Sequence, residues 1–84
     1  MSLHDDVCRI LWEEWDPMGL RPFTDIPNEY GSYAETISRY ILEGRDEFKM
    51  ISHLQQLQRN AMGLSHVDNE RDRRVARLLL SLGE

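Results

Sequence analysis

Apolar residues recur along the chain at helical rather than alternating spacing, which predicts an all-α protein. Glycine, proline and capping residues divide the chain into four such segments. The first predicted helix spans about Leu3 to Trp15 and opens at Ser2, a helix-capping residue. Its apolar stripe is broad and predicts contact with more than one neighbour: Leu3, Val7, Ile10, Leu11 and Trp15.

A proline-rich stretch, residues 16–27, follows the first helix. It holds Pro17, Pro22 and Pro27 together with Gly19. Each proline removes a backbone donor and restricts the residue before it, so the stretch cannot be a regular helix throughout. We therefore predict an ordered linking loop here.

The second and third helices are bounded by glycine and aspartate. The second begins near Asn28 and runs to Glu43, with Gly44 as a left-handed terminator. Asp46 caps the third, which extends to Met62. The two helices are therefore predicted to lie on either side of a short turn.

The fourth helix is capped by Ser65 or Asp68 and carries a regular apolar stripe. The stripe consists of Val75, Leu78, Leu79 and Leu82. Leu80 points away from it, which in so small a chain makes a homodimer plausible. Four antiparallel helices with short turns and one longer loop predict a compact four-helix bundle, with residues 1–84 as a single domain.

The triplet Met-Gly-Leu occurs twice, at residues 18–20 and 62–64. In the stretch "WEEWDPMGL", the letters Asp-Pro-Met-Gly predict a type I turn from Asp16 to Gly19. At the second copy Gly63 follows an unbroken helical stripe and predicts a Schellman ending, with Leu64 folding back on the preceding turn. The two copies are thus interpreted as different structural devices.

Composition narrows the class of protein. The chain has 84 residues, 40% apolar and 30% charged, which is typical of a globular domain. No run is long enough to span a membrane and nothing resembles a signal peptide. The single cysteine, Cys8, fits a reducing compartment, so we expect a cytoplasmic protein.

Charge is unevenly distributed along the chain. Residues 1–47 carry a net charge of −7 and residues 48–84 one of +2, for a total of −5. The overall acidity argues against binding nucleic acid through its phosphates. The arginines near the C-terminus alternate with Asp68, Glu70 and Asp72, which predicts a solvated, ion-paired helix face. The acidic front half instead favours a partner with a basic surface.

Catalytic and metal-binding patterns are weak. His4 and Cys8 lie one helical turn apart, but two ligands do not make a metal site. No nucleophile with an oriented base and no phosphate-binding glycine loop is recognisable. We therefore predict no enzyme, no metal and no cofactor. The alternative is a metal-dependent or small-ligand-binding protein or enzyme built from His4, Cys8 and the carboxylates.

Glu14 falls within the apolar face of the first helix, which leaves two interpretations open. A residue in the last helical turn can reach solvent. Alternatively, Glu14 is partly buried and hydrogen-bonded to Gln58, which also lies on an apolar face, or to a tyrosine hydroxyl.

Aromatic and acidic side chains gather around the predicted loop. Aromatic residues are favoured at protein interfaces because they combine large contact area with a polar group. We predict a partner-binding surface made of Trp15, Asp16, Asp25, Glu29, Tyr30 and Tyr33. Core packing explains most of these residues equally well. The predicted function is non-enzymatic protein binding, and the small, acidic chain would suit an immunity or antitoxin protein.

The order of short motifs resembles a family of short bacterial proteins of unknown function. The motifs here are "WDPMGL" at 15–20, "PNEYGSY" at 27–33 and "MGL" at 62–64. The family carries Trp-Asp-Pro-Ile-Gly, then Pro-x-Asp-Glu-Tyr-Asp-x-Tyr, and a later Met-Gly-Leu. Asn28 and Gly31 stand where the family tends to have aspartates, which weakens a cation site at those positions. The resemblance implies a small helical fold and no particular activity.

Overall fold

The computed structural model describes residues 2–20, 30–44 and 46–83. This part of the chain forms four α-helices and two short π-helical turns and contains no strand, which confirms the predicted all-α class. The elements are α1 (Leu3–Ile10), η1 (Leu11–Trp15), α2 (Gly31–Leu42), α3 (Glu47–Gln56), η2 (Leu57–Ala61) and α4 (Asn69–Ser81).

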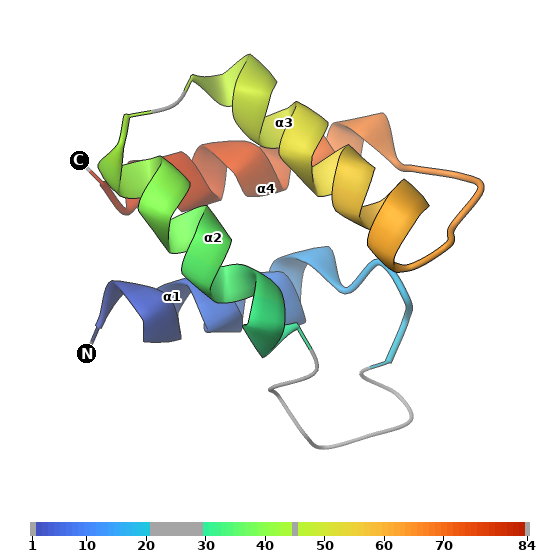
Figure 1. Ribbon diagram of the computed structural model, residues 1–84, viewed down its shortest axis with the longest axis horizontal. Coiled ribbons are helices and arrows are strands. Elements are labelled where there is room, and N and C mark those ends of the chain that lie inside the picture. Colours follow the sequence, from blue (N-terminus) through green and yellow to red (C-terminus); the bar gives the residue numbers. More distant parts are fainter. Residues whose placement is uncertain (1, 21–29, 45, 84) are drawn as a thin grey trace.

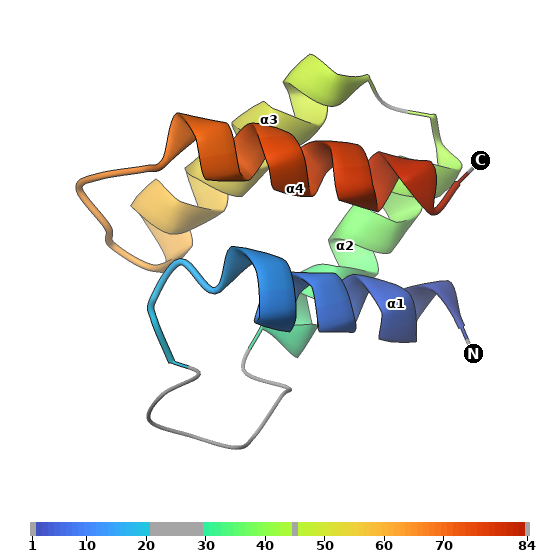
Figure 2. The same cartoon turned by 180° about the vertical axis from the view of Figure 1, so that it is seen from behind.

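The four helices lie in two layers. Helices α1 and α4 run side by side in opposite directions on one side of the molecule, nearest the viewer in Figure 2. Helices α2 and α3 cross them obliquely on the other side, nearest the viewer in Figure 1. The fold is therefore a compact helical bundle whose two layers enclose one core.

Three of the helix starts follow the capping rules read from the sequence. The side chains of Ser2, Asp46 and Asp68 accept hydrogen bonds from backbone N–H groups three residues later. Asp68, rather than the alternative Ser65, caps α4. Helix α2 begins at Gly31, after Tyr30, and not at Asn28 as predicted. Residues 21–27 of the predicted loop, and residues 28 and 29 of the predicted second helix, lie outside the described residues.

The first and third predicted helices each finish in a widened turn that the sequence did not predict. The backbone N–H of Asp16 bonds to the carbonyl of Leu11 at 2.9 Å, and that of Met62 to the carbonyl of Leu57 at 3.0 Å. These bonds span five residues instead of four, which is the geometry of a π-helix. Left-handed residues follow both turns, Asp16 with φ 34° and Gly63 with φ 69°.

The two Met-Gly-Leu copies differ as the sequence analysis proposed. Gly19 N–H bonds to the carbonyl of Asp16 at 3.0 Å, which closes a tight turn over Asp16 to Gly19. At the second copy Gly63 is the left-handed helix stop, and Leu64 N–H bonds back to the carbonyl of Gln58 at 2.8 Å. That bond spans one residue more than a Schellman ending does, because η2 is a π-helical turn.

The core draws on every α-helix. Its fully buried members include Leu11, Ile37, Leu54 and Leu79, and each such side chain contributes about 1.5–3 kcal/mol by leaving water. Cys8 is half-buried and packs against this core. None of the helices in the described part of the chain has the length and hydrophobicity needed to span a membrane.

Candidate protein-binding surface

The structure removes Trp15 and Tyr30 from the predicted partner-binding surface. Both side chains are buried, at 2% and 1% exposed, and their rings pack together with centroids 5.7 Å apart. The ring of Trp12 lies 6.1 Å from that of Tyr30 on another side. Their aromatic area therefore stabilises the junction of η1 with the start of α2, and the prediction that they contact a partner is wrong.

Asp16 directs its carboxylate into the protein. Its Oδ1 accepts a hydrogen bond of 2.6 Å from the Tyr30 hydroxyl and one of 2.9 Å from the Leu20 backbone N–H. The Tyr30 hydroxyl in turn accepts a bond from the Met18 N–H at 3.2 Å. Asp16 thus secures the turn after η1 against α2, and this arrangement gives it a structural role.

Of the other predicted contact residues, the structure describes only Tyr33. Tyr33 is half-buried and packs against the core. Asp25 and Glu29 lie outside the described residues. In the described part of the chain, the acidic and aromatic residues of the predicted surface therefore pack and form hydrogen bonds between η1 and the start of α2.

A buried polar cluster, missed by the sequence analysis, lies between η1, η2 and α4. Asp72 has no exposed surface, and its Oδ1 accepts a hydrogen bond of 3.0 Å from the indole N–H of Trp15. The Gln58 amide nitrogen lies 3.1 and 3.0 Å from the two carboxylate oxygens. The prediction that Asp72 belongs to a solvated helix face is wrong, because its carboxylate has these two buried donors.

Arg71 completes the buried cluster. Its Nη2 donates to the Gln58 side-chain carbonyl at 2.8 Å, and its Nε lies 3.7 Å from Asp72 Oδ1. The signal for Asp72 was present in the sequence, because it lies three residues before Val75 and therefore on the apolar stripe of α4. The two π-helical turns carry the donors Trp15 and Gln58, so the widened turns are part of what brings them to Asp72.

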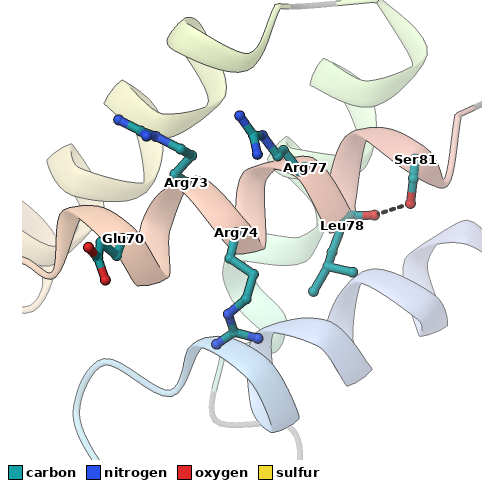
Figure 3. A pocket seen from close by; sticks show the side chains of 6 residues that line it. All are labelled: Glu70, Arg73, Arg74, Arg77, Leu78 and Ser81. Atoms are coloured by element: carbon teal, nitrogen blue, oxygen red, sulfur yellow. Dashed lines mark hydrogen bonds between the residues drawn. The ribbon is translucent and has the colours of Figure 1, made fainter.

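Glu14 is exposed to solvent, which is the first of the two interpretations given for it. Its Oε2 forms an ion pair of 2.6 Å with Nη1 of Arg74 on α4. The alternative hydrogen bond to Gln58 is wrong, because the Gln58 amide is bonded to Asp72 instead. Figure 3 shows Arg74 reaching from α4 toward the blue ribbon of the first helix.

The His4 and Cys8 pair shows no further ligand. Cys8 Sγ lies 3.7 Å from His4 Nδ1. Within the described residues no group of three histidine, cysteine, aspartate or glutamate side chains could hold a metal ion. Burial, and secondarily the charge of Asp5, raises the pKa of the Cys8 thiol, which disfavours the thiolate that metal binding and nucleophilic attack require.

A second candidate for a protein-binding surface lies at the start of α3. Phe48, in the first turn of α3, leaves 77% of its surface exposed. It lines two hollows, one on each side of its own helix. We call this region the Phe48 surface. Its first hollow is lined by Phe48, Asp46, Glu47, Ile51, Arg73 and Arg77, and its second by Phe48, Lys49, Gln56 and neighbouring residues.

The first hollow lies between α3 and α4 and measures about 460 Å³. Figure 3 shows Arg73 and Arg77 projecting from the side of α4 on which α3 lies, away from Arg74. Arg77 Nε bonds to Glu47 Oε1 at 2.8 Å. No ion pair within the described residues involves Arg73. An exposed aromatic ring thus lies beside a hollow with an available guanidinium group.

The second hollow lies on the other side of Phe48 and measures about 420 Å³. Lys49 and Gln56 line it together with Tyr40 and His53, whose rings are in edge-to-face contact at 4.7 Å. Lys49 is exposed, and within the described residues its ammonium group forms no ion pair. In the part of the chain that the structure describes, Phe48 is therefore flanked in each hollow by one cation that forms no ion pair.

Fold and surface together define a small all-α protein with an apolar anchor exposed on one face. Comparison of the chain with protein-family models, with curated proteins and with solved structures found no match. The resemblance to the bacterial family with Trp-Asp-Pro-Ile-Gly and Met-Gly-Leu motifs stays a prediction.

Proposed function

We propose that this protein is non-enzymatic and acts by binding another protein through the Phe48 surface. The observation that carries the proposal is the exposure of Phe48 between two hollows. An exposed aromatic side chain beside a hollow offers a partner a large apolar contact area, which Leu42, equally exposed but beside neither hollow, does not. Protein binding was also the function predicted from the sequence, but the proposed contact is now the Phe48 surface instead of the acidic and aromatic residues around the predicted loop.

The geometry matches the usual anatomy of a protein interface. Binding energy is concentrated in a few large side chains that fill or flank pockets, surrounded by a polar rim. Phe48 supplies the large side chain, and Ile51 adds apolar area to the lining of the first hollow. Arg73, Arg77 and Lys49 supply a polar rim on both sides.

A matched pair of variants tests the proposal. Leu42, at the end of α2, is also 77% exposed but lines neither hollow. Affinity capture from a lysate of the source organism should recover a partner with the wild type and with Leu42→Ser. Phe48→Ser should lose it. Equal recovery by both variants would contradict the proposal.

An immunity or antitoxin role, a homodimer and a cytoplasmic location stay predictions. The toxin-binding version needs an acidic contact surface, and the exposed acids Asp5, Glu13 and Glu14 lie on α1 and η1, across the molecule from α3. Charge reversal of Asp5 and Glu13 would test that face separately. No observation favours the metal-dependent alternative at His4 and Cys8.

A further inference from the structure

We infer that the partner contacts the Phe48 surface with an acidic segment that carries a large apolar side chain. The inference rests on the proposed function and names the chemistry of the partner. It follows from three features of the Phe48 surface. These are the position of its apolar residues, the pairing of its charged residues, and the position, on either side of Phe48, of two cations that form no ion pair within the described residues.

The apolar contact is built by two residues one helical turn apart. Phe48 and Ile51 are on the same side of α3 toward α4, and both line the first hollow. Its volume of about 460 Å³ is ample for one aromatic or branched aliphatic side chain. A partner residue seated there would cover Phe48 and displace water from the apolar wall.

The acidic side chains around Phe48 have partners within the protein, whereas two of the basic side chains do not form ion pairs in the described part of the chain. Asp46 accepts a hydrogen bond of 2.8 Å from the Lys49 backbone N–H as the cap of α3. Glu47 is paired with Arg77 at 2.8 Å. Both acids of the surface are thus engaged within the protein, whereas no ion pair in the described part of the chain involves Arg73 or Lys49.

The placement of these two cations defines the complementary ligand. Arg73 lines the first hollow and Lys49 the second, so a chain crossing Phe48 meets one cation before and one after its apolar anchor. A guanidinium group binds a carboxylate through two parallel hydrogen bonds, and an ammonium group binds it as a point charge. Carboxylates on either side of an apolar residue therefore satisfy the surface.

Two other occupants fit less well. A nucleic acid would bring a continuous run of phosphates to a chain of net charge −5, whereas a short acidic segment needs only the two cations beside Phe48. A second copy docked symmetrically by this same surface would bring Arg73 and Lys49 near their own counterparts. Like charges across an interface are unfavourable, so a partner of opposite charge is preferred.

The test is a selection from a random peptide library displayed on phage, with the full chain immobilised as bait. Peptides retained by the wild type are counter-selected against Phe48→Ser, which isolates those that need the Phe48 surface. The enriched peptides are then synthesised and measured against Arg73→Glu/Lys49→Glu. Arg59→Glu is the control, because Arg59 is exposed at η2 and lines neither hollow.

The expected result is enrichment of peptides with several acidic residues around one aromatic or branched aliphatic residue. Their affinity should fall about tenfold or more in the double charge reversal, a change of about 1.4 kcal/mol, and stay unchanged in Arg59→Glu. Enrichment of basic or neutral peptides that still depend on Phe48 would overturn the inference and leave the proposed function standing.

Two further outcomes are decisive. Absence of any peptide that depends on Phe48 would overturn both the inference and the proposed function. Sedimentation of the wild type and of Phe48→Ser tests the predicted homodimer, and we expect no dimer that depends on Phe48 at the concentrations of the selection. A dimer that Phe48→Ser dissociates would show that a second copy occupies the surface and would overturn the acidic partner.

Discussion

Asp72 has the least solvent contact of any charged side chain in the described structure, and its carboxylate accepts hydrogen bonds from two buried side chains. Trp15 and Gln58 donate to its carboxylate, and Arg71 lies beside it. A buried polar group is costly only when its partners are missing. The cluster therefore links η1, η2 and α4 through one residue.

Replacing Asp72 by alanine should be strongly destabilising. The change leaves the Trp15 indole N–H without an acceptor in the core and takes the carboxylate away from the Gln58 amide, which keeps only the Leu54 carbonyl as acceptor. Each buried donor left unsatisfied costs about 1–3 kcal/mol. We expect the free energy of unfolding to fall by about 2–5 kcal/mol in urea titrations. Glu70→Ala, on the exposed side of α4, is the control and should change it by less than about 0.5 kcal/mol. Similar small losses in both variants would contradict the role of the cluster.

Tyr30 should make stability depend on alkaline pH. Burial, and then its hydrogen bond to Asp16, raises the pKa of the Tyr30 hydroxyl above its ordinary value. The folded state therefore holds this proton more tightly than the unfolded state. The resulting stabilisation is complete below the tyrosine pKa of the unfolded chain, about 10, and is lost as pH rises above it.

The comparison that isolates this effect is wild type against Tyr30→Phe. The variant should lose about 1.5–3 kcal/mol at neutral pH, because a hydrogen bond to a charged acceptor disappears. The difference between the two proteins in urea unfolding should shrink as pH is raised from about 9 to about 11. A constant difference over that range would show that the Tyr30 proton is not linked to folding.

Some residue roles could be predicted from the sequence and others could not. The caps Asp46 and Asp68 and the helix stop Gly63 follow from local backbone chemistry and are where the sequence put them. Asp72 was misjudged because its neighbours in sequence are arginines, whereas its neighbours in space are Trp15 and Gln58. Only its place on the apolar stripe of α4 pointed to burial.

At the scale of elements, the helices were predictable and their widened ends were not. Periodicity locates the stripes of α1 through α4 because burial of one face repeats every 3.6 residues. A π-helical turn adds one residue to a single turn, and η1 and η2 leave no mark in that pattern. The predicted start of α2 at Asn28 was early, because Tyr30 is held outside the helix by Asp16 and Met18.

The end of η2 offers a test of how the third helix is stopped. Gly63 has φ 69°, and a Cβ atom added there would meet no atom within 4 Å. The cost of Gly63→Ala is therefore confined to the backbone and should be about 1–2 kcal/mol, measured by thermal unfolding. Gly63→Asn should cost less, since asparagine tolerates the left-handed region. An alanine variant as stable as the wild type would rule out this requirement for glycine.

At the scale of the whole molecule, charge and exposed apolar area are separated in a way the sequence totals do not show. The chain carries −5 overall, yet the Phe48 surface holds two cations that form no ion pair in the described structure. The exposure of Phe48 was not predicted from the sequence. The hollows beside it could not be predicted, because they depend on how α3 packs against α4 and α2.

The most direct test of the central claim is the effect of Phe48→Ser on partner affinity and on folding, measured together by calorimetric titration with the captured partner and by urea unfolding. Truncating an interface anchor costs about 2 kcal/mol or more, so the dissociation constant should rise about thirtyfold. The free energy of unfolding should change by less than about 0.5 kcal/mol, because the side chain is exposed. An unchanged dissociation constant, or a loss of affinity matched by a loss of stability, would contradict a binding role for Phe48.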